Sequence, residues 1–134
     1  MAQTDVDVVL DQFAAVNDRD FARAMELYAG DVVLVVDPAA FLENGTFEGR
    51  DAVGRWFGNW FSTFEPGYRF EIEEAEAVGD SVLIVARHHG RGRSSGAEVR
   101  GHTSYVYEVR DGRIARVGLY ADRAKAVRAA GAQP

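Results

Sequence analysis

The 134-residue sequence contains no cysteine. This absence excludes disulfide bonds, thiolate metal sites and a cysteine nucleophile. No apolar run approaches the roughly 18 residues that a membrane span requires, and the opening MAQTDVDVVL lacks the basic start and long apolar stretch of a signal peptide. We therefore expect a cytoplasmic protein with no membrane partner.

Basic residues are fewer than acidic ones. Lys and Arg number 15 against 21 Asp and Glu, which gives a net charge of -6. Nucleic-acid-binding domains normally carry a basic face, so this balance argues against a nucleic-acid partner. Apolar residues make up 47% and aromatic residues 11%. That content is enough for one packed core in a single domain spanning residues 1–134.

The first half of the chain has mainly helical periodicity. Apolar spacing predicts two helices between Thr4 and Tyr28, separated by a break at residues 17–20, with Gly30 just after the second. A β-branched strand over 32–36 follows and ends at Asp37-Pro38. After an irregular stretch, a third helix begins near Gly49 and stops at Pro66-Gly67.

The second half alternates as strands do. We expect four antiparallel strands between Tyr68 and about Ala121, with a bulge near Glu73-Glu74 and a two-residue hairpin turn at Asp111-Gly112. A short helix from Asp122 to Arg128 follows. The predicted fold class is α+β, with three helices on the concave face of a strongly bent antiparallel sheet that encloses a pocket.

The Asp111-Gly112 turn also predicts which side chains share a face. It places Tyr107 opposite Arg116 and Thr103 opposite Tyr120. One face is small and aliphatic and suits a pocket wall: His102, Ser104, Val106, Ala115, Val117, Leu119 and Ala121. The other carries Tyr105, Tyr107 and Tyr120 and suits a homodimer interface, because exposed aromatic residues need covering.

Asp37 is the first candidate for chemistry. It ends an apolar strand, where its carboxylate is expected at the pocket mouth. A partly apolar wall raises a carboxyl pKa, and such a group can remove a proton next to a carbonyl. The alternative interpretation is that Asp37 caps the turn that follows.

The three histidines lie on the predicted sheet. His88 and His89 are adjacent, so their side chains point to opposite faces. A hairpin loop near Ser94 places His102 opposite Arg87 and on the same face as His89. An imidazole oriented by a carboxylate forms an acid–base pair near neutral pH; alternatively, these are surface histidines. No convergent carboxylates accompany them, so no metal site is predicted.

Several other side chains suit a pocket or a plainer role. Trp56 and Trp60 lie one helical turn apart on an apolar stripe, where they serve the core, the pocket or both. The Tyr28 hydroxyl is placed to reach a ligand oxygen. Arg91 and Arg93 lie in a glycine-rich loop that joins two strands, so we interpret them as solvated charges at a hairpin tip and not as a phosphate site.

Five segments together resemble the SnoaL-like branch of the nuclear-transport-factor-2-like superfamily, over essentially the whole chain. They are Asn17-Asp18-Arg19-Asp20-Phe21, residues 27–32, residues 47–53, Arg110-Asp111-Gly112-Arg113-Ile114 and residues 120–126. The resemblance implies a cone-shaped α+β barrel with an apolar pocket, often as a homodimer. The superfamily includes ketosteroid isomerases, scytalone dehydratase, limonene epoxide hydrolase, polyketide cyclases and non-catalytic binding domains.

The resemblance also suggests roles for residues. Ketosteroid isomerase-like proteins carry their general base in a similar strand-Asp-Pro context, which corresponds to Asp37. Scytalone dehydratase-like enzymes combine an Asp with histidines on neighbouring strands, which corresponds to Asp37, His102 and His89. The helix-one tyrosine of the isomerases falls near Gln12 or Phe13, so that phenol is missing here. Asp37 with Arg87 supplies only part of the epoxide hydrolase pattern.

Two functional hypotheses follow. The first is an isomerase, dehydratase or cyclase that acts by cofactor-independent proton transfer on an apolar oxygenated small molecule. Its catalytic residues are Asp37, His102 and His89, and its pocket residues are Tyr28, Trp56, Trp60, Arg87, Ser104, Val117 and Leu119. The second hypothesis is a non-catalytic module of the same fold that binds an apolar ligand or a partner. Both predict a homodimer through the sheet face and no cofactor.

Overall fold

The computed structural model describes residues 4–131, in which four helices and six strands are found. In chain order they are α1 (Asp5–Asn17), α2 (Phe21–Glu26), β1 (Tyr28–Val36), β2 (Gly45–Glu48), α3 (Arg50–Ser62), β3 (Arg69–Val78), β4 (Ser81–Arg91), β5 (Glu98–Arg110), β6 (Arg113–Tyr120) and α4 (Arg123–Gly131). The strands form one curved sheet in the order β2-β1-β6-β5-β4-β3. None of the described helices is long and apolar enough to cross a membrane.

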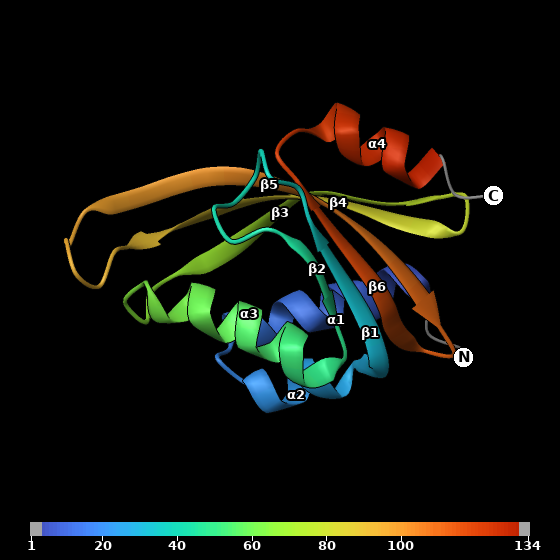
Figure 1. Ribbon diagram of the computed structural model, residues 1–134, viewed down its shortest axis with the longest axis horizontal. Coiled ribbons are helices and arrows are strands. Elements are labelled where there is room, and N and C mark those ends of the chain that lie inside the picture. The colour runs from blue at the N-terminus through green and yellow to red at the C-terminus, as the bar shows by residue number, and fades with distance from the viewer. Residues whose placement is uncertain (1–3, 132–134) are drawn as a thin grey trace.

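The sheet lies between two helical layers (Figure 1). Helices α1, α2 and α3 cover its concave face, and α4 packs on the opposite face. The main core lies on the concave side and includes Leu34, Ile84 and Val117, each with 0% exposure. A smaller cluster around Leu83 and Ala126 lies beneath α4. A fully buried aliphatic side chain contributes about 1.5–3 kcal/mol to stability, so the concave core dominates.

Local capping and turn signals are confirmed. The Thr4 hydroxyl accepts the N–H of Asp7 at the start of α1, and Asp20 accepts the N–H of Arg23 in α2. The Asp111-Gly112 turn joins β5 to β6, with both residues at positive φ (54° and 76°). The predicted bulge in β3 also occurs, as a shift in register between Ile72 and Glu74.

Three expectations for the first half are wrong. The sheet is mixed and not purely antiparallel, because β1 lies parallel to β6. Strand β2 forms in the stretch expected to be irregular, where it pairs with residues 33–36 of β1. Gly30 lies inside β1, because α2 already ends at Glu26 and the Leu27 carbonyl accepts the N–H of Ile114 from β6. Long-range strand pairing, absent from local periodicity, causes all three differences.

The last hairpin contains a register shift between Glu108 and Val109 that changes its faces. Tyr107 therefore lies opposite Val117 and not Arg116, and Tyr120 lies opposite Ser104 and not Thr103. Partners across an antiparallel pair share a face, so the expected pocket wall and dimer face are corrected. Tyr105 and Tyr107 are buried on the concave side and do not form an exposed dimer face.

Candidate functional site

A cavity of about 450 Å³ lies between the concave face of the sheet and helices α1, α2 and α3. Its size is typical of a pocket for a drug-sized molecule. It is lined by Gln12, Phe13, Val16, Arg19, Phe21, Ala24, Met25, Tyr28, Gly54, Phe57, Gly58, Phe61, Ser62, Phe70, Arg93, Tyr105 and Tyr107. Of the predicted pocket residues, Tyr28 is in this lining.

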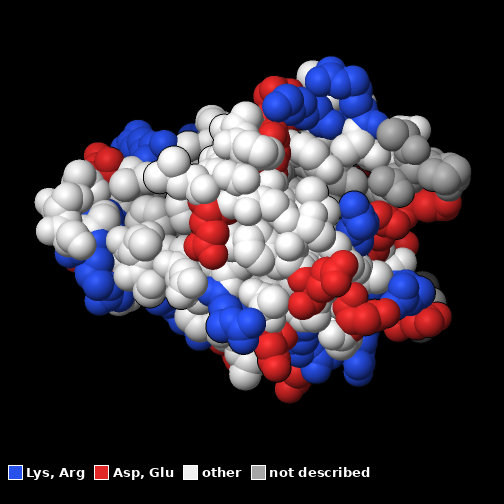
Figure 2. Space-filling model, viewed as in Figure 1, with Lys and Arg blue, Asp and Glu red and all other residues white. Residues whose placement is uncertain are grey.

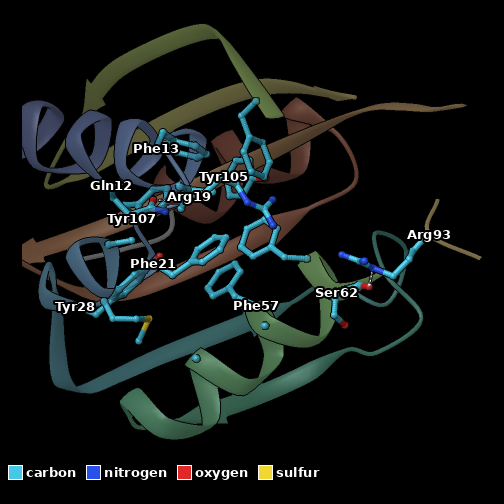
Figure 3. A pocket seen from close by; sticks show the side chains of 17 residues that line it. Gln12, Phe13, Arg19, Phe21, Tyr28, Phe57, Ser62, Arg93, Tyr105 and Tyr107 are labelled. Atoms are coloured by element: carbon cyan, nitrogen blue, oxygen red, sulfur yellow. Dashed lines mark hydrogen bonds between the residues drawn. The ribbon is translucent and has the colours of Figure 1, made fainter. Parts of the chain in front are cut away.

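The sequence of each element explains the shape of the cavity. On α3, Gly54 and Gly58 lie one turn apart and leave room beside the rings of Phe57 and Phe61. Figure 3 shows Gln12 and Tyr107 at one end of the cavity and Ser62 and Arg93 at the other, with the aromatic side chains between them. The cavity is thus an aromatic chamber with polar groups at both ends.

Gln12 and Tyr107 form a buried polar pair that sequence reasoning missed. The Tyr107 hydroxyl donates to Gln12 Oε1 at 3.1 Å, and both side chains are almost fully buried. Burial raises the pKa of Tyr107, so its phenol stays protonated. With Oε1 occupied, the amide N–H groups of Gln12 are the donors left for a ligand oxygen.

Two further phenols line the chamber. Burial raises the pKa of Tyr28 and of Tyr105, so both are neutral hydrogen-bonding groups near pH 7. The Tyr28 ring packs beside Phe57, with the ring centroids 6.3 Å apart. No carboxylate or imidazole is among the described residues that line the cavity. The arrangement therefore supplies donors to an oxygen and contains no conventional general base.

Asp37 lies outside this lining. Its Oδ1 accepts the N–H of Ala39 at 3.2 Å, and Lys125 Nζ of α4 lies 3.2 Å from its Oδ2. The Ala39 N–H, followed by Lys125, holds the pKa of Asp37 below its ordinary value, despite the opposing effect of desolvation. The sequence led us to expect a raised pKa for Asp37, from a partly apolar wall. It does not show that α4 brings Lys125 to this carboxylate. The turn-capping interpretation agrees with the Ala39 contact.

The two predicted catalytic histidines, His102 and His89, lie on the face of the sheet that is turned away from the cavity. Arg87 lies opposite His102 as predicted, and Glu73 contacts both, with its oxygens 2.8 Å from Arg87 Nη2 and 3.1 Å from His102 Nε2. His89 borders a shallow hollow beside Glu65. The structure therefore does not bring His102, His89 or Arg87 to the cavity or to Asp37; β6 separates β1 from β5.

The remaining predicted pocket residues serve packing. Trp56 and Trp60 stack 6.4 Å apart, and their indole N–H groups donate to the Glu43 carbonyl and the Tyr68 hydroxyl. They border a second hollow, on a face over α3 that is largely uncharged (Figure 2). The last three do not line the cavity: Ser104 is buried on the α4 side of the sheet, and Val117 and Leu119 lie in the concave core.

His88 is a buried histidine behind the chamber wall. Its side chain lies against Trp60, Tyr68 and Phe70, and its Nδ1 has no hydrogen-bond partner among the described residues. Desolvation lowers the pKa of His88, with smaller contributions from His102 and His89. The neutral imidazole is therefore the form that the folded state accommodates.

We expect the free energy of unfolding to decrease as the pH falls below about 6.5. There the unfolded chain binds a proton at residue 88 that the folded chain excludes, until the pH reaches the lower folded pKa. The slope is at most about 1.4 kcal/mol per pH unit. Urea unfolding at pH 7.5 and at pH 5.5 measures the change in the free energy of unfolding between the two pH values. The variant His88→Leu should show a smaller change than wild type. An unchanged slope in the variant would contradict this role.

The fold and a family model place the chain among known proteins. The model of the SnoaL-like domain matches residues 9–117. A proposed polyketide cyclase from Sinorhizobium meliloti is 29% identical, with a TM-score of 0.66, and the match covers 85% of this chain and 94% of that chain. No curated protein matches the chain in sequence.

Two more distant solved structures share the fold. One is a SnoaL-like polyketide cyclase-type protein from Jannaschia sp. CCS1, with 17% identity, a TM-score of 0.75 and coverage of 100% of this chain and 99% of that one. The other is TerC, co-crystallised with polyporic acid, with 18% identity, a TM-score of 0.72 and coverage of 95% and 98%. Because the family model spans most of the chain, the protein belongs to the SnoaL-like family.

Proposed function

We propose that this protein is a cofactor-independent cyclase or isomerase that acts on an apolar, oxygenated small molecule in the aromatic chamber. The observation that carries the proposal is the Gln12–Tyr107 pair, which presents hydrogen-bond donors at one end of a cavity lined by aromatic side chains. Two of the structural neighbours are described as proposed polyketide cyclases, and TerC was co-crystallised with polyporic acid. These likenesses support a small-molecule ligand.

The chemistry that suits this site is enolisation. When a C–H bond next to a carbonyl breaks, its electron pair moves onto the carbonyl oxygen, and the proton passes to water. Donation from the Gln12 amide and the Tyr28 hydroxyl stabilises the charge that develops on that oxygen. The enolate carbon then takes a proton at another position, which is isomerisation, or attacks a second carbonyl of the same molecule, which is cyclisation.

The cavity composition also favours a second candidate, a non-catalytic binding protein. The described lining contains no carboxylate or imidazole, and Asp37 faces Lys125 instead. A chamber of this kind binds an apolar molecule without a proton acceptor of its own. The two candidates differ in whether the bound molecule exchanges its α-protons.

An exchange assay separates them. We expect the protein to accelerate deuterium incorporation at the α-carbon of 2-tetralone in heavy water, followed by proton NMR. Gln12→Met removes the amide donors and should slow the protein-dependent exchange by about a hundredfold. Asp37→Asn is the comparison variant and should retain the rate. If 2-tetralone binds and its exchange is not accelerated, the protein is the non-catalytic binding protein. If Asp37→Asn loses the exchange rate and Gln12→Met keeps it, Asp37 is the general base and the proposed role of Gln12 is wrong.

A further inference from the structure

The charged residues of the chamber are both cationic. The chain as a whole carries a net charge of -6, yet the described lining contains Arg19 and Arg93 and no carboxylate. Both arginines are exposed residues, and two charges of one sign at a cavity attract anions. The cavity is thus opposite in sign to the protein that contains it.

Arg19 lies in the turn between α1 and α2, and it forms no direct ion pair with the aspartates on either side of it. Asp18 and Asp20 flank it, but both pair with Arg23, at 3.6 and 3.8 Å. Among residues 4–131, no ion pair involves Arg19; its guanidinium lies 5.0 Å from the Phe21 ring centroid. The direct ion pairs of the two adjacent aspartates are therefore made with Arg23 and not with Arg19.

The backbone of Arg19 is also unusual. Its φ of 61° places a long side chain in the left-handed region, which is uncommon for residues other than glycine and asparagine. Strain of this kind persists where the surrounding structure holds it, and it is frequent at ligand sites. Arg19 combines this conformation with a place in the cavity lining.

Arg93 reaches the cavity from the β4–β5 hairpin. Its Nε donates to the Ser62 carbonyl at 3.2 Å and its Nη2 to the Phe64 carbonyl at 3.1 Å, while its backbone N–H donates to the Thr63 carbonyl. The carbonyls at the end of α3 therefore hold this cation beside Ser62 (Figure 3). Arg93 is exposed in the hairpin turn, as the sequence predicts, but its guanidinium is also held by backbone carbonyls, which the sequence does not show.

The geometry points to a ligand that is an organic anion: an apolar ring system bearing a carboxylate, bound with its rings in the aromatic chamber and attracted by the charges of Arg19 and Arg93. This inference rests on the proposed small-molecule function and specifies its substrate class. Guanidinium groups form charge-assisted hydrogen bonds with carboxylates, and these are stronger than the bonds that a neutral isostere makes. A neutral amide of the same shape should therefore bind more weakly.

The test compares 2-naphthoate with 2-naphthamide by isothermal titration calorimetry. We expect wild type to bind the naphthoate about tenfold more tightly, with a preference that shrinks as salt is added. Arg19→Gln and Arg93→Gln should each reduce the preference, while Arg113→Gln, which removes an exposed arginine outside the cavity, should keep it. Equal affinities, or a preference that neither cavity variant changes, would overturn the inference and leave the chamber a site for neutral molecules.

A second variant guards against loss of folding. Arg19→Gly removes the guanidinium and relieves the positive φ, so it should lose the preference for naphthoate with a melting temperature no lower than wild type. If neither naphthoate nor naphthamide binds wild type, the proposed function fails together with this inference. If both bind equally, only the anion preference fails.

Discussion

Gly58→Trp is expected to remove small-molecule binding while the protein remains folded. Gly58 lies on α3 and lines the chamber, and a Cβ built there meets no atom within 4 Å. An indole at this position can pack against the apolar side chains that line the chamber. It then occupies the space that a ligand would take. Replacing a helical glycine also improves helix propensity by a few tenths of a kcal/mol, so stability should not fall.

The affinity for 2-naphthoate should decrease by more than about a hundredfold, or roughly 2.7 kcal/mol. Calorimetry measures the affinity, and urea unfolding measures the stability. Arg55→Trp is the matched control, because it adds the same side chain to an exposed position of α3 outside the lining. Retained binding in Gly58→Trp would place the ligand elsewhere on the protein.

Gly90→Ala is expected to destabilise the protein strongly. Gly90 lies in β4 beside Tyr68, the residue that precedes β3. A Cβ at Gly90 would lie 2.9 Å from the Cα of Tyr68 and 2.8 Å from its Cδ2. Because one of these atoms belongs to the backbone, the two segments must move apart. Overpacking of this kind typically costs about 1–3 kcal/mol.

The control for this prediction is Gly30→Ala. Gly30 also lies in a strand, but its Cβ would meet no atom within 4 Å and its φ is not positive. It should leave stability unchanged or raise it by up to about 1 kcal/mol. Urea unfolding of both variants gives the two free energies. Equal stability of the two variants would show that the contact at Tyr68 relaxes without cost.

The close contact at Gly90 matters to the site because Tyr68 supports the chamber wall. The Tyr68 ring stacks on Phe64 at 4.2 Å between centroids and packs at 5.4 Å against Phe70, which lines the cavity. Its hydroxyl also accepts the indole N–H of Trp60. A displaced Tyr68 is therefore expected to move the lining as well as to lower stability.

Local chemistry determined much of the fold from the sequence alone. Thr4 and Asp20 cap their helices through contacts three residues away, and Asp111-Gly112 turns the chain between neighbouring strands. Such interactions need no distant partner, so composition and spacing are sufficient to predict them. Asp20 and Asp111-Gly112 also belong to the segments that carry the resemblance to the SnoaL-like family, which the family model confirms.

The tertiary structure alone decided which side chains meet at the site. Gln12 and Tyr107 are 95 positions apart, and Asp37 meets Lys125 across 88 positions. One extra residue in the register near Glu108 moves Tyr107 to the face of Val117, since side chains alternate between faces along a strand. Periodicity indicates that a strand has two faces; only the packing of distant segments selects the face that borders the cavity.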